Sequence, residues 1–233
     1  MVLSFKKYIK EGYREDSPSE NEEELNGLHK SLTHHYHKRS KLGFFEKMAV
    51  QNYTNNSSSI NSHLWENKGG SHDEPYGADL EDMDKVLHGH KTPHDLTVYS
   101  GLNAAPNISK TTKIYHHPAY LSTSLSHQTA SGFANSIYGK HRDTPTSSSQ
   151  TVHKHTLRIH VPKGHPGFVP GPLSVYPEER EVLLPRGLKL RIDPSKSETR
   201  RHTMKWNTTG GNKKISTTHV HHIHHAEIVG EEE

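Results

Sequence analysis

The stretch that decides the fold is Tyr176-Pro177-Glu178-Glu179-Arg180-Glu181-Val182-Leu183-Leu184-Pro185-Arg186-Gly187. Its first half is acidic and its second half is apolar. Acidic residues are poor strand formers, whereas Val-Leu-Leu is typical of a buried strand. We therefore predict a loop that leads into a strand, with the acids at the mouth of the strand. Because side chains alternate along an extended chain, Glu179 and Glu181 are expected to project from the same face.

Neighbouring carboxylates repel each other unless a cationic group or a shared proton offsets the repulsion. Two interpretations of the acidic stretch therefore stay open on these residues alone. It is either a solvated turn before a core strand or part of a site that receives a positive charge. The rest of the chain has to decide between them.

The composition limits the class of protein. The chain has 233 residues, enough for one sizeable domain with an extension or for two small domains. Hydrophobic residues make up only 29%, so part of the chain is expected to pack poorly. The net charge of +3, from 29 basic and 26 acidic residues, permits nucleic-acid binding but does not require it. The absence of cysteine excludes a disulfide framework, a thiolate metal site and a cysteine nucleophile.

No segment has the pattern of a signal peptide or a membrane span. The N-terminal Met1–Lys7 stretch lacks the apolar run of a signal peptide. No stretch approaches the ~18 apolar residues of a spanning helix. We therefore expect a soluble protein that acts inside a cell and has no membrane partner.

The first ninety residues favour helices. Residues 1–40 read as a charged, partly helical extension, in which Glu22–Tyr36 carries leucines three and four positions apart. This narrow stripe is expected to dock on the main domain, 41–233. Further helices are predicted in the helical part of that domain, 41–90, over Lys41–Val50, from Ile60 onwards and over Asp79–His88. The Asn- and Ser-rich residues 52–59 are expected to separate the first two of these.

Between residues 95 and 229 the pattern is mostly that of strands. The predicted strands are Leu96–Tyr99, Ala119–Ser124, His153–Val161, Val182–Leu184, Leu188–Ile192 and His219–Val229. A helix is expected around Ala130–Ile137, and polar connections over 142–150 and between the last two strands. Helices followed by many short strands are typical of an α+β fold rather than of alternating βαβ units.

Three separated pieces of the chain carry a resemblance to a known family. They are Leu96-Thr97-Val98-Tyr99-Ser100-Gly101-Leu102, Leu121-Ser122-Thr123-Ser124-Leu125 and Glu179-Arg180-Glu181-Val182-Leu183-Leu184-Pro185-Arg186-Gly187. In order and spacing they resemble the motifs of mono-ADP-ribosyltransferases of the arginine–serine–glutamate class. The segment Tyr53-Thr54…Ile60-Asn61…Leu64 is similar to that family's N-terminal helical signature, and His116-His117-Pro118-Ala119-Tyr120 resembles the transferases of T-even-like bacteriophages. The resemblance covers about residues 41–229.

The resemblance implies a fold and an activity. The fold would be a split β-sandwich of two short sheets with N-terminal helices, with NAD as co-substrate in the cleft and no metal. The activity would be transfer of ADP-ribose from NAD to arginine side chains of host proteins, with release of nicotinamide. The implied partner is a protein with an exposed arginine, in the host transcription or translation machinery. The implied location is the host cytoplasm, and carriage in the virion is compatible with it.

The resemblance also implies roles for residues. Glu181 matches the catalytic glutamate that stabilises the oxocarbenium-like ribose, and Ser122 matches the serine that holds this glutamate or the nicotinamide ribose. Glu179 matches the first glutamate, which orients and deprotonates the incoming guanidinium, and Glu-x-Glu points to arginine as the target. Tyr176 is the aromatic residue expected to touch the acceptor protein. The remaining implied NAD contacts are Tyr99, Ser100, Gly101, Leu102, Thr123, Ser124 and Phe133.

Simpler interpretations of these NAD contacts stay open. Tyr99 and Gly101 also fit a strand that ends in a turn, and Phe133 also fits a core position. One position departs from the family pattern, because Ser100 stands where the family usually has an arginine that grips the NAD phosphates. The second hypothesis is therefore a catalytically impaired relative that binds a protein or an RNA. Assays of NAD turnover separate the two.

The chain contains 23 histidines, and five of them lie between His219 and His225. Such a cluster raises the hypothesis of a metal site. In a strand, however, His219 and His221 face one way while His222 and His224 face the other, which splits the cluster. We therefore favour a solvated or partner-facing strand over a metal site, and assign His153, His155 and His160 to a strand surface.

Overall fold

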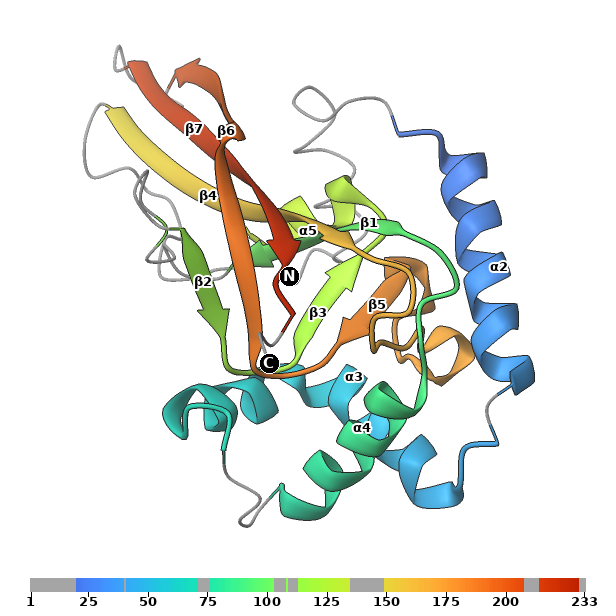
Figure 1. Ribbon diagram of the computed structural model, residues 1–233. Coiled ribbons are helices and arrows are strands. Elements are labelled where there is room, and N and C mark those ends of the chain that lie inside the picture. The colour runs from blue at the N-terminus through green and yellow to red at the C-terminus, as the bar shows by residue number, and fades with distance from the viewer. Residues whose placement is uncertain are drawn as a thin grey trace.

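The computed structural model describes residues 20–39, 41–70, 76–102, 108, 113–134, 149–207 and 214–230. Along the chain the elements are α2 (Glu22–Arg39), α3 (Phe44–Glu66), α4 (Gly77–Gly89), β1 (Leu96–Leu102), β2 (Ile114–His117), β3 (Leu121–Ser124), α5 (His127–Phe133), β4 (Ser149–Val161), the 3₁₀ turns η1 (Gly171–Leu173) and η2 (Pro177–Glu179), β5 (Glu181–Leu184), β6 (Leu188–Asn207) and β7 (Lys214–Ile228). Apart from α5, the helices precede the strands, which confirms the α+β class (Figure 1). Within these residues, no helix is both long enough and apolar enough to cross a membrane.

The strands form one curled sheet in the order β2-β6-β7-β4-β1-β3-β5. Strands β4 and β7 run parallel, and the other neighbours are antiparallel. The predicted description as two separate short sheets is not confirmed, because β1 joins both halves. It pairs along its whole length with β4, but with β3 it shares only the register pair Tyr99↔Ser124. The β3–β5 pair is thus attached to the rest of the sheet at a narrow point.

The two C-terminal strands are much longer than predicted. Strand β6 continues from Leu188 to Asn207, and β7 begins at Lys214, so the expected polar connection is largely strand. The extension is held by cross-strand pairing rather than by apolar content. A register shift between Asp193 and Glu198 marks an irregularity in β6. There the Asp193 carboxylate accepts hydrogen bonds from the backbone and side chain of Ser195.

The predicted N-terminal helix forms and docks on the rest of the molecule. Leu32 and Tyr36 of α2 are each 1% exposed and belong to the main hydrophobic core. The rings of Tyr36 and Phe168 meet edge-on, with 5.6 Å between their centroids. The Nε2 atom of His37 lies 3.1 Å from the Val169 carbonyl oxygen. The predicted domain boundary at residue 40 stays a prediction, but α2 packs into the same core as the strands.

Residues 52–59 contain the kink that separates two helices within α3, as predicted, although the second helix follows the first without a loop. Helix α3 runs through them with non-helical angles only at Asn56 (φ −135°, ψ 36°). Tyr53 before the kink and Ile60 and Leu64 after it are all buried, and burial of this common face outweighs the local preference for a turn. Helix α4 forms as predicted, and Figure 1 shows α3 and α4 together beneath the β3–β5 end of the sheet.

Candidate active site

Glu181 and Ser122 meet across the pair of strands β3 and β5. Ser122 is opposite Leu183, and Ser124 is opposite Glu181, so the serine reaches the carboxylate diagonally. Ser122 donates its hydroxyl to Glu181, with 2.5 Å between Oγ and Oε1. Glu181 is only 8% exposed, and burial raises the pKa of its carboxyl to about 7, while the bond from Ser122 acts in the lowering direction. Buried carboxylates with raised pKa values are typical of catalytic sites.

Glu179 lies beside this pair but not in an extended strand. It ends the 3₁₀ turn η2, and the next residue, Arg180, is left-handed (φ 50°, ψ 46°), so the predicted alternation of side chains is wrong here. The charge of Glu181 nevertheless affects the pKa of Glu179. Burial raises the pKa of Glu179 to about 8, and the charges of Glu181 and Glu178 add to the rise. The site therefore holds two carboxyls whose pKa values lie above the ordinary value for glutamate.

The other hydroxyls of the Ser-Thr-Ser strand hold the backbone around the two acids. Ser124 donates to the Glu179 carbonyl at 2.6 Å, and Thr123 donates to the Val182 carbonyl at 2.6 Å. Both hydroxyls are therefore engaged in positioning β5 and its entry loop. The NAD contacts predicted for these two residues stay predictions.

Ser100, at the position of the family's arginine, is 5% exposed and bonds to the backbone of Ser122 from the neighbouring strand β1. Its hydroxyl donates to the Ser122 carbonyl with an Oγ–O distance of 2.9 Å. Ser100 is thus brought together with Ser122 and Glu181, as the motifs predicted. Its short side chain fixes the backbone of the serine, and its predicted contact with NAD stays a prediction.

Tyr99 and Gly101 lie on the opposite face of β1, against α5. The Tyr99 ring meets His127 edge-on at 5.2 Å. A Cβ on Gly101 would lie 2.2 Å from the Ala130 carbonyl oxygen, so glycine is required there for the close approach of α5. The structure does not bring these two residues to Glu181. Their predicted place beside nicotinamide stays a prediction.

Two further predicted NAD contacts and the predicted acceptor contact are placed as follows. Leu102 is 7% exposed and belongs to the core, and Phe133 is half-buried at the end of α5. Tyr176 and its neighbour Val175 are 46% and 48% exposed, and the Val175 amide donates to the Thr54 hydroxyl at 3.4 Å. An exposed aromatic residue beside Glu179 fits the predicted acceptor contact, which stays a prediction.

Tyr53 of α3 lies close enough to Glu181 to be affected by its charge, and Asn61 bonds to Tyr53; neither was predicted as a site residue. Asn61 donates from Nδ2 to the Tyr53 hydroxyl at 3.1 Å, and that hydroxyl donates to the Tyr120 carbonyl at 3.4 Å. Burial raises the pKa of the Tyr53 phenol well above its ordinary value, and the charge of Glu181 adds to the rise. The spacing of eight residues on one helix face was a signal that could have found this pair.

The histidines of β7 divide between the two faces of the sheet as predicted. His221 stacks on His127 and bonds to Thr156, whereas His222 and His224 stack with His153 and His155 of β4. Over the described residues, no group of three or more His, Asp or Glu side chains is arranged to hold a metal ion.

The fold and the site together define a mixed helix-and-strand protein with a serine-bound glutamate at the mouth of β5. Residues 29–222 match the family model described as ADP-ribosyltransferase exoenzyme, and the chain belongs to that family. Members of the family transfer ADP-ribose from NAD, and we assign this general activity to the chain. No curated protein sequence matches the chain.

Solved structures show the same fold. Plx2a, an ADP-ribosyltransferase toxin from Paenibacillus larvae, is 22% identical, with a TM-score of 0.56, and the match covers 89% of this chain and 96% of that one. The Clostridium limosum C3 exoenzyme is 20% identical, with a TM-score of 0.56 and coverage of 85% and 93%. C3stau2 from S. aureus, solved with NAD, is 22% identical, with a TM-score of 0.54 and coverage of 83% and 94%. None of these bears on the resemblance to bacteriophage transferases, which stays a prediction.

Proposed function

We propose that this chain transfers ADP-ribose from NAD to an arginine side chain of another protein and releases nicotinamide. The observation that supports the proposal is the pair of carboxyls with raised pKa values, the half-buried Glu179 and the buried Glu181, of which Glu181 accepts the hydroxyl of Ser122. A host protein of the transcription or translation machinery stays the proposed acceptor. A bacteriophage origin belongs to the same proposal.

Glu181 suits the bond-breaking half of the reaction. The bond between the ribose C1′ and the nicotinamide nitrogen breaks, the nitrogen keeps the electron pair, and positive charge develops on the ribose. An ionised Glu181 stabilises that charge, and Ser122 holds the carboxylate in one orientation. A buried carboxylate beside a hydroxyl donor also fits recognition of the ribose hydroxyls, which both donate and accept hydrogen bonds.

Glu179 suits the bond-forming half. A guanidinium is a fork of donors that needs an acceptor, and its positive charge lowers the pKa of a carboxyl beside it. Arrival of the acceptor therefore favours ionisation of Glu179, whose pKa is otherwise raised to about 8. A guanidinium nitrogen then attacks C1′, and its proton passes to Glu179. The exposed Tyr176 is the proposed contact for the acceptor protein.

Substitution of each glutamate separates the two halves. We expect Glu181→Gln to lower both nicotinamide release and transfer to a small guanidine acceptor such as agmatine by about 100-fold or more. Glu179→Gln should keep nicotinamide release into water but lose transfer. The control is Glu178→Gln, which removes an exposed acid from the same loop. Wild-type protein that releases no nicotinamide in the presence of guanidine acceptors would contradict the proposal.

The alternative hypothesis, an impaired relative that binds a protein or an RNA, is not favoured by the match to the transferase family and rests on Ser100 alone. The serine cannot supply the charge of an arginine to the NAD phosphates, and its hydroxyl is already engaged with Ser122. This candidate predicts no NAD turnover in wild-type protein and no effect of Glu181→Gln. The same assay therefore decides between the two.

A further inference from the structure

Arg180 has an unusual backbone conformation between the two acids. Its φ of 50° and ψ of 46° fall in the left-handed region, which L-residues other than glycine rarely adopt. Among the described non-glycine residues, only Lys68 shares a positive φ. A strained conformation persists where the surroundings hold it, and such positions gather at functional sites. The contacts of Arg180 therefore bear on how Glu179 and Glu181 are placed.

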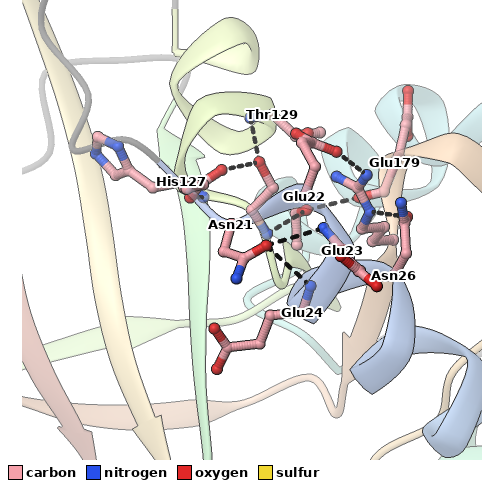
Figure 2. Close-up of polar contacts among 12 residues, drawn as sticks. Asn21, Glu22, Glu23, Glu24, Asn26, His127, Thr129 and Glu179 are labelled. Carbon is pink, nitrogen blue, oxygen red and sulfur yellow. Dashed lines mark hydrogen bonds and ion pairs between the residues drawn. The ribbon is translucent and has the colours of Figure 1, made fainter.

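The side chain of Arg180 is anchored on the first turn of α2. Its Nε donates to the Asn26 Oδ1 atom at 3.0 Å, and its terminal nitrogen forms an ion pair with Glu22 (Figure 2). The Arg180 side chain is 13% exposed, whereas that of Glu22 is 61% exposed. The Arg180 carbonyl accepts the Leu125 amide at 3.2 Å, directly after the Ser-Thr-Ser strand. Both ends of the residue are thus held.

The same N-terminal segment also holds α5. The Glu20 carboxylate accepts the Ser126 hydroxyl at 2.7 Å and the His127 amide at 2.5 Å, where α5 begins. Asn21 accepts the amides of Glu23 and Glu24 and so caps the start of α2 (Figure 2). Residues 20–26, here named the N-terminal strap, therefore bind both the acidic loop and the helix that follows Ser-Thr-Ser.

The strap lies outside the part of the chain that matches the family model, which begins at residue 29. We propose that the N-terminal strap is a positioning device of this chain: Glu22 and Asn26 hold Arg180, and Arg180 sets the relative placement of Glu179 and Glu181. The proposal rests on the proposed function. Arg180 acts through the two glutamates and does not touch the substrate.

The strap is suited to placement more than to stability. Glu22 is largely solvated, and an ion pair with one partner in water adds little to the free energy of unfolding. A displacement of a catalytic group by about 1 Å, in contrast, lowers a rate by about 100-fold. Loss of the strap contacts is therefore expected to lower kcat while the melting temperature changes little.

A competing role for Arg180 makes a different prediction. If Arg180 itself gripped the NAD phosphates in place of the arginine that Ser100 replaces, removal of Glu22 would free it for NAD. The KM for NAD would then fall in the Glu22 variant and rise in the Arg180 variant. In the positioning role both variants lower kcat, and the KM for NAD stays near that of the wild type.

The test uses three variants of the full chain. Arg180→Gly keeps the left-handed backbone accessible and removes the anchoring side chain. Glu22→Gln with Asn26→Ala removes the anchor points, and Glu23→Gln with Glu24→Ala is the control, with two exposed acids changed in the same turn. We expect a 10- to 100-fold fall in kcat for nicotinamide release in the first two, a KM for NAD within about twofold, and no change in the control. Combining the first two variants should add no further loss.

Hydrogen–deuterium exchange of peptides covering 176–184 supplies a readout that does not depend on turnover. Exchange should rise in Arg180→Gly and in the Glu22/Asn26 variant and stay at the wild-type level in the control. An unchanged kcat in Arg180→Gly, an unchanged exchange in both variants, or opposite changes of KM would overturn the positioning role. Wild-type protein without NAD turnover would instead refute the proposed function, and exchange would still decide whether the strap holds the loop.

Discussion

Ser122 and Glu181 form a short diagonal hydrogen bond between neighbouring strands, with 2.5 Å between the hydroxyl and carboxylate oxygens. Two opposing influences meet at this carboxylate. Burial disfavours its charged form, whereas the serine hydroxyl favours it, and burial dominates, with a pKa of about 7 as the result. The ionised fraction of Glu181 near neutral pH therefore depends on the balance between its burial and this hydrogen bond.

Removal of the Ser122 hydroxyl should move the pH dependence of catalysis. In Ser122→Ala the pKa of Glu181 rises further, so the acid limb of kcat for nicotinamide release shifts to higher pH and activity at pH 7 falls about 10-fold. The measurement is the pH–rate profile. Thr123→Val is the matched control, because its hydroxyl bonds the Val182 carbonyl and not the carboxylate. An acid limb that stays in place in Ser122→Ala would refute this role of the bond.

The raised pKa of Glu181 also predicts the direction of stability with pH. In the unfolded chain the carboxyl ionises near its ordinary pKa of 4.5, whereas in the folded chain it keeps its proton up to about pH 7. Through this carboxyl the folded state binds more protons between these values, so the contribution of Glu181 to the free energy of unfolding falls as pH rises through them, by up to about 3 kcal/mol. Urea unfolding at pH 5, 6 and 8 measures this. Glu181→Gln should flatten the slope and be the more stable protein at pH 8.

The sequence motifs place Ser122 and Glu181 in one candidate site, and the structure joins them by a hydrogen bond. The motifs predict the roles of these two residues, whereas the pairing of β3 with β5 that joins them was not predicted. The sequence pattern predicts Glu179 in an extended strand, and this is wrong because the chain turns at Arg180. Local patterns predict which side chains a strand presents, but they do not predict a left-handed residue held by distant partners.

Contacts between distant segments account for most of what the sequence did not reveal. Arg180 and Glu22 are 158 positions apart, and nothing in the local pattern of either pairs them. Strand β2 was missed for a similar reason, because its four residues are defined by pairing with Leu188–Arg191. The length of β6 and β7 depends on each strand supporting the other. Local pattern gave the class of fold, and tertiary contacts set the extent of the strands.

The histidine ladder, His153 and His155 of β4 with His222 and His224 of β7, should make the protein sensitive to acid. The distance from His153 Nδ1 to His222 Nε2 is 2.9 Å, and that from His155 Nδ1 to His224 Nε2 is 3.0 Å. In each pair one ring must be neutral to accept the hydrogen bond. Burial, with the neighbouring histidines adding, lowers the pKa of His155 and His224 to about 4.

In the unfolded chain His155 and His224 bind protons below about pH 6.5, whereas in the folded chain they stay neutral down to about pH 4. The contribution of these two histidines to the free energy of unfolding therefore falls as pH drops from 6.5 towards 4. His155→Gln should weaken this dependence, and His160→Gln, an exposed position on the other face of the same strand, should not. Urea midpoints at pH 6.5, 5.5 and 4.5 provide the comparison. Equal slopes in the wild type and His155→Gln would show that the ladder is not the acid-sensitive element.

Two glycine-to-alanine substitutions should change stability in opposite directions. At Gly101 a Cβ would lie 2.2 Å from the Ala130 carbonyl oxygen and 2.5 Å from the Ala134 amide nitrogen. Because these atoms belong to the backbone of α5, the helix must shift, and Gly101→Ala should lower the free energy of unfolding by about 3 kcal/mol. At Gly27, inside α2, a Cβ meets no atom of the described residues within 4 Å. Gly27→Ala should therefore raise the free energy of unfolding by about 0.5–1 kcal/mol, since alanine favours the helix. Urea unfolding of both variants gives the comparison, and a Gly101→Ala variant as stable as the wild type would mean that α5 does not pack on β1 as closely as described.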